Sequence, residues 1–174
     1  VLIQQPVYYP FRAVVEDNER VCINSPLVLN DGRYEMDYKD MERKITENHV
    51  KLFILCSPHN PVGRVWSVEE LKKVIAICKK HGVFIISDEI HCDFTYPGHS
   101  HTVLAKLAGD YLDHVIVCTS PSKSFNLAGL QLSHIFIPDE TVRENFKKEL
   151  WVIPYDESGT LALVAGRAAY EKGG

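Results

Sequence analysis

The stretch VKLFILCSPHNPVGRVWSVEELKKVIAICKKHGVFIIS, residues 50–87, decides the fold. It begins and ends with short apolar runs rich in Val, Ile, Leu and Phe, which predict strands at Lys51–Cys56 and Val83–Ser87. The residues between them have the spacing of an amphipathic helix, Ser67–His81. A strand, a helix and a second strand in this order form a βαβ unit with a right-handed crossover, so the two strands should be parallel.

Capping residues mark where the predicted helices begin and end. The Ser67 hydroxyl can cap the first turn, Glu70 three residues later completes a capping box, and Gly82 stops the helix. Asp37 can cap a second helix, and Pro138-Asp139 opens a third. Apolar residues repeat at helical spacing in all three segments: Leu71, Val74, Ile75 and Cys78; Met41 and Ile45; Val142, Phe146 and Leu150.

The same alternation of strands and helices continues along the chain. It predicts an α/β fold, a three-layer and mostly parallel sheet with helices on both faces. The chain contains no linker or internal repeat, so we expect one domain core over residues 1–150, followed by a terminal segment, 151–174, with a helix at Gly159–Tyr170. The remaining predicted strands are Val1–Gln5, Arg20–Ile23, Val115–Cys118 and Leu132–Ile137.

Composition excludes several classes of protein. Of the 174 residues, 45% are hydrophobic and 24% charged, which is typical of a globular chain and not of a disordered or collagen-like one. The longest apolar runs fall far short of the ~18 residues that a membrane-spanning helix needs. The net charge of −4, without a Lys/Arg cluster, argues against nucleic acid as a partner. The five cysteines form no CxxC pair, which favours reduced thiols and a cytoplasmic location.

Polar segments follow four of the predicted strands. Ligands of open parallel sheets bind at the carboxyl ends of the strands, so these segments should lie together. They offer a stacking aromatic, an amide, a carboxylate with a histidine, and a lysine among hydroxyls, a set that suits a planar, phosphorylated, electron-withdrawing cofactor. The segments are Pro6–Phe11, Ser57–Gly63, Ser87–His91 and Thr119–Phe125.

Pyridoxal phosphate is the cofactor that these residue types fit. A lysine amine is needed to form a Schiff base with its aldehyde, and Lys123 lies in the fourth segment. A buried carboxylate such as Asp88 would pair with the pyridine nitrogen and favour its protonated form. Hydrogen-bond donors complete the set, with Asn60 and His91 for the phenolate oxygen and Ser120 and Ser122 for the phosphate.

Three motifs carry a resemblance to a known family. They are SPHNPVGRVW (57–66), SDEIHCDF (87–94) and TSPSKSFNLAGLQ (119–131). Together they resemble the fold-type I, class I/II aminotransferase superfamily, and within it the carbon–sulfur β-lyases of the cystathionine β-lyase group. The order and spacing of the motifs fit that family's large domain, and the similarity spans essentially the whole chain.

The resemblance implies a role for each candidate site residue within the pyridoxal-phosphate-binding large domain of the aspartate-aminotransferase-like fold. His91 is the most specific position, because many aminotransferases carry tyrosine there and the lyase-like group carries histidine. The implied roles are Lys123 as Schiff-base lysine, Asp88 as pyridinium partner, Asn60 and His91 as phenolate-oxygen ligands, Tyr8 as ring stacker, and Ser120 and Ser122 as phosphate donors.

The chain also departs from the broader family. Gln131 stands eight residues after Lys123, where many members carry a phosphate-binding arginine. The family's glycine-rich phosphate segment and its substrate-carboxylate arginine are absent, so they should lie before Val1 and after Gly174. We therefore expect a large-domain fragment that alone binds the cofactor weakly and has no turnover.

For the complete protein the resemblance implies β-elimination on a small amino-acid substrate, with a homodimer as the active form. Cystathionine or a cysteine S-conjugate would give a thiol, pyruvate and ammonia. A class I/II aminotransferase shares the early steps and remains an alternative. A second alternative is an aminotransferase-like module that binds an effector and regulates; a DNA-binding helix-turn-helix upstream of Val1 would favour it.

Other motif interpretations are weaker. Asp88-Glu89 after a buried strand is similar to a Walker B end, but no GxxxxGK[ST] loop is present. The S-x-x-K match that ends at Lys123 lacks the K-T-G partner of penicillin-binding enzymes. A zinc site is less favoured than a loop with surface histidines, because no second Cys or His pair has the required spacing. The residues that raise the zinc question are His91, Cys92, His99 and His101.

Overall fold

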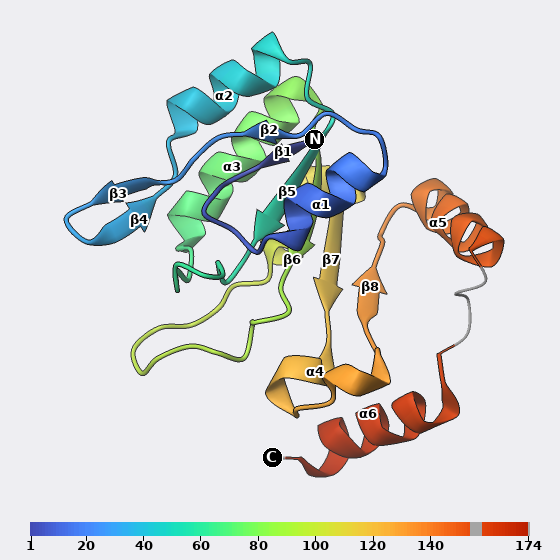
Figure 1. The fold of residues 1–174 in the computed structure, drawn as a ribbon. Coiled ribbons are helices and arrows are strands. Elements are labelled where there is room, and N and C mark those ends of the chain that lie inside the picture. Colours follow the sequence, from blue (N-terminus) through green and yellow to red (C-terminus); the bar gives the residue numbers. More distant parts are fainter. Residues whose placement is uncertain (154–157, 174) are drawn as a thin grey trace.

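The computed structural model describes residues 1–153 and 158–173 and contains a six-stranded sheet (Figure 1). The strand order is β2-β1-β5-β6-β7-β8, and every neighbouring pair is parallel except β7 with β8. This arrangement confirms the predicted mostly parallel sheet. The strands are β1 (Leu2–Ile3), β2 (Ile23–Asn24), β5 (Leu52–Cys56), β6 (Phe84–Asp88), β7 (Val115–Thr119) and β8 (His134–Phe136).

Helices cover both faces of the sheet. Leu2 packs into the main core with residues of α2 and α3, whereas the next residue, Ile3, packs with Phe11 of α1. Successive strand residues point to opposite faces, so α1 lies across the sheet from α2 and α3. The helices are α1 (Pro10–Asp17), α2 (Tyr38–Glu47), α3 (Val68–His81), α4 (Pro121–Ser124), α5 (Glu140–Val152) and α6 (Thr160–Lys172), with 3-10 turns η1 (Leu104–Leu107), η2 (Gly109–His114) and η3 (Ala128–Leu130).

The βαβ unit β5-α3-β6 has the predicted form. The Ser67 hydroxyl accepts from the Glu70 amide at 3.2 Å, and the Glu70 carboxylate accepts from the Ser67 amide at 2.7 Å, which is the predicted capping box. Gly82 ends α3 in the left-handed conformation, with φ of +63°. The predicted helix bounds are therefore confirmed to within one residue.

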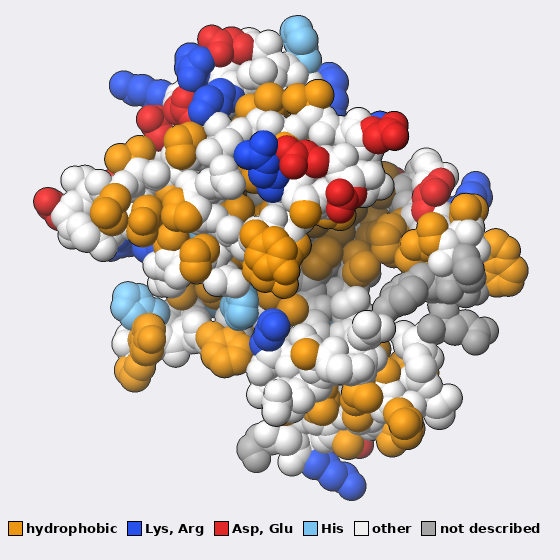
Figure 2. Space-filling view, in the orientation of Figure 1, with side chains coloured by type: hydrophobic (Ala, Val, Ile, Leu, Met, Phe, Trp, Pro, Cys, Tyr) orange, Lys and Arg blue, Asp and Glu red, His pale blue; other side chains and the backbone are white. Residues whose placement is uncertain are grey.

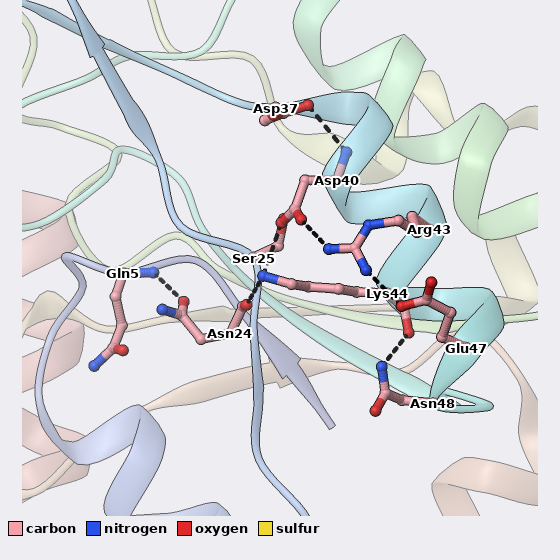
Figure 3. A network of polar contacts seen from close by, with 9 residues as sticks. All are labelled: Gln5, Asn24, Ser25, Asp37, Asp40, Arg43, Lys44, Glu47 and Asn48. Carbon is pink, nitrogen blue, oxygen red and sulfur yellow. Dashed lines mark hydrogen bonds and ion pairs between the residues drawn. The ribbon is translucent and has the colours of Figure 1, made fainter.

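A polar network fastens α2 to the sheet near the start of the chain (Figure 3). Asp40, in the first turn of α2, accepts from the Ser25 hydroxyl at 2.9 Å and pairs with Lys44. Lys44 in turn donates to the Asn24 carbonyl at 2.6 Å, and the Asn24 side chain accepts from the Gln5 amide at 2.9 Å. The segment that follows Gln5, which carries Tyr8, is thus held at the end of β1.

The β3–β4 hairpin and helix α1 were not predicted. Val28–Asn30 (β3) and Arg33–Glu35 (β4) form an antiparallel hairpin, whose turn residues Asp31 and Gly32 both have positive φ. The segment after the first strand continues into helix α1, with Pro10 at its first turn.

The first two strands differ from their predicted bounds. Only Leu2–Ile3 of the predicted Val1–Gln5 pairs in the sheet. The predicted Arg20–Ile23 strand is displaced to Ile23–Asn24, because the Arg20 amide closes the end of α1 by donating to the Val15 carbonyl at 3.0 Å.

The C-terminal helices form where the sequence predicts them. Asp139 caps α5 by accepting from the Val142 amide at 2.7 Å, and α5 continues across the predicted boundary at residue 150. Helix α6 packs on α4, where the Tyr170 and Phe125 rings lie 5.8 Å apart. Apolar side chains stay exposed on β8 and α6, and the surface is hollowed beside them (Figure 2).

No helix within residues 1–153 and 158–173 is long and apolar enough to cross a membrane. The five cysteines are free thiols, and Cys56 and Cys78 are buried.

Replacing the cap of α3 should destabilise the protein measurably. Ser67→Ala leaves the Glu70 amide without its side-chain acceptor, so the free energy of unfolding of the full-length protein should fall by about 1 kcal/mol. Urea denaturation followed by circular dichroism measures the difference, with Ser100→Ala in the exposed loop as a control. Equal midpoints for the two variants would show that the capping box contributes no stability.

Candidate cofactor-binding site

A cavity of about 410 Å³ lies at the carboxyl ends of β5, β6 and β7. Its lining comes from four segments that are far apart in the sequence, as predicted from the strand ends. All seven predicted site residues line it, namely Tyr8, Asn60, Asp88, His91, Ser120, Ser122 and Lys123. The geometry thus brings the predicted set together, while the role of each residue remains a prediction.

Asp88 is the last residue of β6, in the middle of the sheet. Its Oδ1 accepts from the Ile90 amide at 3.1 Å, which orients the carboxyl group. Burial raises the pKa of Asp88, and the nearby His91 opposes that rise in part. A cationic group placed against Asp88 would offset this effect of burial and favour the ionised carboxylate.

Asn60 lies in a tight turn after β5. The backbone N–H of Asn60 donates to the Cys56 sulfur at 3.4 Å, and the backbone N–H of Gly63 donates to the His59 carbonyl at 2.9 Å. The indole of the buried Trp66 reaches back to the Cys56 carbonyl at 2.9 Å. These contacts fix the turn from both ends and leave Asn60 on the cavity wall.

His91 follows β6 by three residues and is partly buried beside Phe94, with the ring centroids 5.9 Å apart. Burial lowers the pKa of His91; Asp88 opposes this shift, and the positive charge of Lys123 adds to it. The imidazole is therefore neutral near pH 7 and can donate one hydrogen bond.

Lys123 lies on the short helix α4, directly after β7. Ser120 caps this helix, because its hydroxyl accepts from the Ser122 amide at 3.0 Å and donates to the Leu132 carbonyl at 2.6 Å. The single hydroxyl proton of Ser120 is thus committed to the backbone, and a bond from it to a phosphate would have to replace that contact. Ser122, in the first turn of α4, also lines the cavity.

Tyr8 lies just before α1, with 44% of the residue exposed. Its ring meets Phe11 edge-on at 6.3 Å and lies 5.5 Å from Tyr9. Tyr8 is therefore not a core aromatic, and its exposed ring surface borders the cavity.

The structure corrects one expectation about the histidines. His101 is not a surface residue, since its side chain is 7% exposed and its Nε2 lies 2.7 Å from the fully buried carboxylate of Glu89. Glu89 also accepts from the Ser87 hydroxyl at 2.9 Å and the Leu104 amide at 3.0 Å. The loop that begins at His91 is thereby fixed at its far end to the strand that carries Asp88.

Cys56 also lines the cavity and was not among the predicted site residues. Its position at the last residue of a buried strand, beside the Asn60 turn, was the available signal.

A second cavity of about 420 Å³ shares Asn60 and His91 with the first and is walled in part by Phe94 and Tyr96. Within the described ranges, no group of three or more His, Cys, Asp or Glu side chains is placed to hold a metal ion.

The fold and the site together define a class of protein. The family model for aminotransferase class I and II matches residues 1–167, and the chain belongs to this family. The resemblance drawn from the three motifs is therefore confirmed at the level of the family.

The relatives point to a narrower group. The chain is 47% identical, over its whole length, to cystathionine beta-lyase PatB of Bacillus subtilis (strain 168), of which it covers 45%. Among solved structures, it matches cystalysin from Treponema denticola, which contains pyridoxal 5'-phosphate, with TM-score 0.96 and 38% identity over 99% of this chain and 44% of that one. It also matches the PLP-bound C-S lyase from Staphylococcus hominis, with TM-score 0.93 and 42% identity over 99% of this chain and 43% of that one. The chain thus spans less than half the length of these relatives.

The buried acid gives a testable pH dependence for the ligand-free full-length protein. Folding raises the pKa of Asp88, so the folded protein binds this proton more tightly than the unfolded chain does. The free energy of unfolding therefore falls as the pH rises from the ordinary carboxyl range through the raised pKa. Asp88→Asn should therefore raise the melting temperature at pH 7, and the gain should vanish at pH values below the ordinary carboxyl range. Differential scanning calorimetry across this range tests the expectation, with Asp17→Asn at the end of α1 as control; a pH-independent gain would contradict it.

Proposed function

We propose that the full-length protein is a pyridoxal-phosphate-dependent carbon–sulfur β-lyase that acts on cystathionine or a cysteine S-conjugate. The observation that carries the proposal is the convergence of the Asp88 carboxylate, the His91 imidazole, the Asn60 amide and the Lys123 amine on one cavity. The similarity to PatB, to cystalysin with its cofactor and to the PLP-bound C-S lyase supports the same proposal.

The cavity fits the ring of this cofactor. Its volume lies within the ~300–1,000 Å³ that is usual for small-molecule sites. The buried Asp88 is suited to a protonated ring nitrogen, and the partly exposed Tyr8 offers a face for stacking. For the phosphate, Ser122 and Ser133 supply hydroxyls, and the cavity lining within the described residues includes no arginine. The remaining phosphate contacts are expected from the rest of the full-length chain.

When bound, the cofactor supplies an electron sink that allows the Cα–H bond of an amino acid to break. Asp88 would hold the proton on the ring nitrogen by its negative charge, and Asn60 and His91 would donate hydrogen bonds to the ring oxygen. Lys123 would hold the cofactor covalently through Nζ. When a substrate amine replaces it, the Lys123 Nζ would act as the general base that takes the Cα proton.

The products follow from the balance of bonds. Lys123 would take the Cα proton, and the sulfur would leave Cβ with the bonding pair and gain one proton to become the thiol. With one water consumed, the three remaining carbons and the nitrogen of the substrate would be released as pyruvate and ammonia. An aminotransferase would use Lys123 for the same first proton, so the identity of this lysine does not separate the two reactions.

Product analysis tests the proposal in the full-length holoenzyme. Incubation with cystathionine should release thiol and pyruvate in equal amounts, detected by a thiol reagent and a coupled lactate dehydrogenase assay. Amino transfer to an added keto acid without thiol release would replace the lyase with an aminotransferase. Neither reaction, combined with binding of a small effector, would favour the regulatory module.

Substitution of Lys123 tests the role of this residue. Lys123→Ala should remove the lysine-dependent visible absorption and lower the elimination rate by about 10²–10⁴-fold, because the general base is lost. Lys72→Ala, on the exposed side of α3, should change neither quantity. Retention of both signals in Lys123→Ala would move the covalent attachment to another lysine.

We further propose that the enzyme works as a homodimer in the cytoplasm. The free thiols suit a reducing compartment. A cation for the phosphate and for a substrate carboxylate has to come from outside the described cavity lining, from the remaining chain or from a second copy. Light scattering of the full-length protein measures its mass, and a monomer that retains full activity would contradict the dimer.

A further inference from the structure

Three side chains form a row across the sheet at the edge of the cavity. Cys56 of β5 pairs in register with Asp88 of β6, which pairs in register with Cys118 of β7. Side chains in register on parallel neighbours point to the same face, so a thiol flanks Asp88 on each side. Burial raises the pKa of Cys56 to about 12 and that of Cys118 to about 11, and in both cases the charge of Asp88 adds to the rise. Both groups are therefore neutral thiols near pH 7.

The two thiols differ in what they touch. Cys56 is 3% exposed. Its thiol donates to the Pro58 carbonyl at 3.4 Å and accepts from the backbone N–H of Asn60 at 3.4 Å. It therefore holds the turn that carries Asn60 against the strand beside Asp88. The backbone carbonyl of Cys118 accepts from the Glu89 amide at 2.8 Å, and its strand pairs with both β6 and β8.

We propose that Cys56 is a positioning residue. Its thiol holds the Asn60 backbone, and so sets the Asn60 side chain at a fixed place relative to Asp88, with the side-chain amide aimed at the ring oxygen of the bound cofactor. The inference rests on the proposed function, because Asn60 has a ring oxygen to meet only when the cofactor is present. A neutral thiol suits this task because it donates to one backbone group of the turn and accepts from another at the same time.

The proposal predicts a spectroscopic effect. A hydrogen-bond donor to the ring oxygen stabilises its deprotonated form, so a displaced donor should raise the pH midpoint of the cofactor's visible absorption band. In the full-length holoenzyme, Cys56→Ala should raise that midpoint by roughly 0.5–1 pH unit. The dissociation constant of pyridoxal phosphate, measured by fluorescence titration, should rise about 3–10-fold, since a loss of about 1 kcal/mol corresponds to a factor of about 5.

A double-mutant cycle separates positioning from a general effect on the cavity. If Cys56 acts through Asn60, Cys56→Ala adds no further midpoint shift to Asn60→Ala, although each variant shifts the midpoint alone. Cys118→Ala is the matched control, because it removes a thiol in register with Asp88 on the opposite side. Any shift that it causes should be the same in both backgrounds.

Cys56→Ser supplies a second test that does not depend on the alanine variant folding. Its hydroxyl keeps a donor and an acceptor on a shorter side chain, so the midpoint should move in the same direction by less, and only while Asn60 is present.

An unchanged midpoint in Cys56→Ala and Cys56→Ser, or a shift that persists in Asn60→Ala, would overturn the proposal. A lower melting temperature without a midpoint shift would reduce Cys56 to a structural role and overturn it too. Failure of the proposed function would appear differently, as the absence of a Lys123-dependent band in the wild-type enzyme.

Discussion

The in-register pairing of three parallel strands is the constraint on which the site depends. Because β5, β6 and β7 run in the same direction and end at the same edge, the turns that follow them open onto one place. Each turn has only to present one side chain toward that edge: Asn60 after β5, His91 after β6 and Lys123 after β7. The chemistry is assembled from distant parts of the sequence without a long loop.

Buried polar groups make this edge rigid. The Glu89 carboxylate, wholly buried next to Asp88, accepts hydrogen bonds from a strand residue and from the start of η1, and it pairs with His101. A buried carboxylate without these partners would cost several kcal/mol. The loop between Glu89 and Leu104 is therefore fixed at both ends by the Glu89 carboxylate, which directly follows Asp88.

The sequence predicted those parts of the fold and of the site that are marked by a few neighbouring residues with a known physical role. The Ser67–Glu70 capping box, the Gly82 stop and the strand-end polar segments predicted both the central βαβ unit and the residues of the cavity. The β3–β4 hairpin was missed although Asp31-Gly32 is a strong turn signal, because its flanking residues are exposed and do not alternate clearly. The Glu89–His101 pair depends on contact across 12 residues of irregular loop, which periodicity does not encode.

The reversal of direction between β7 and β8 has a consequence for Lys123. Residues 120–133 leave the sheet at one strand and return at its neighbour, so the two ends of this excursion are about 4.8 Å apart and are closed by the bond from Ser120 to Leu132. The entropy lost on closing this loop is a cost of folding and is not incurred again when a ligand binds. The backbone segment that carries Lys123 is thus closed at its base, and the reach of the Lys123 amine is set by its own four-carbon side chain.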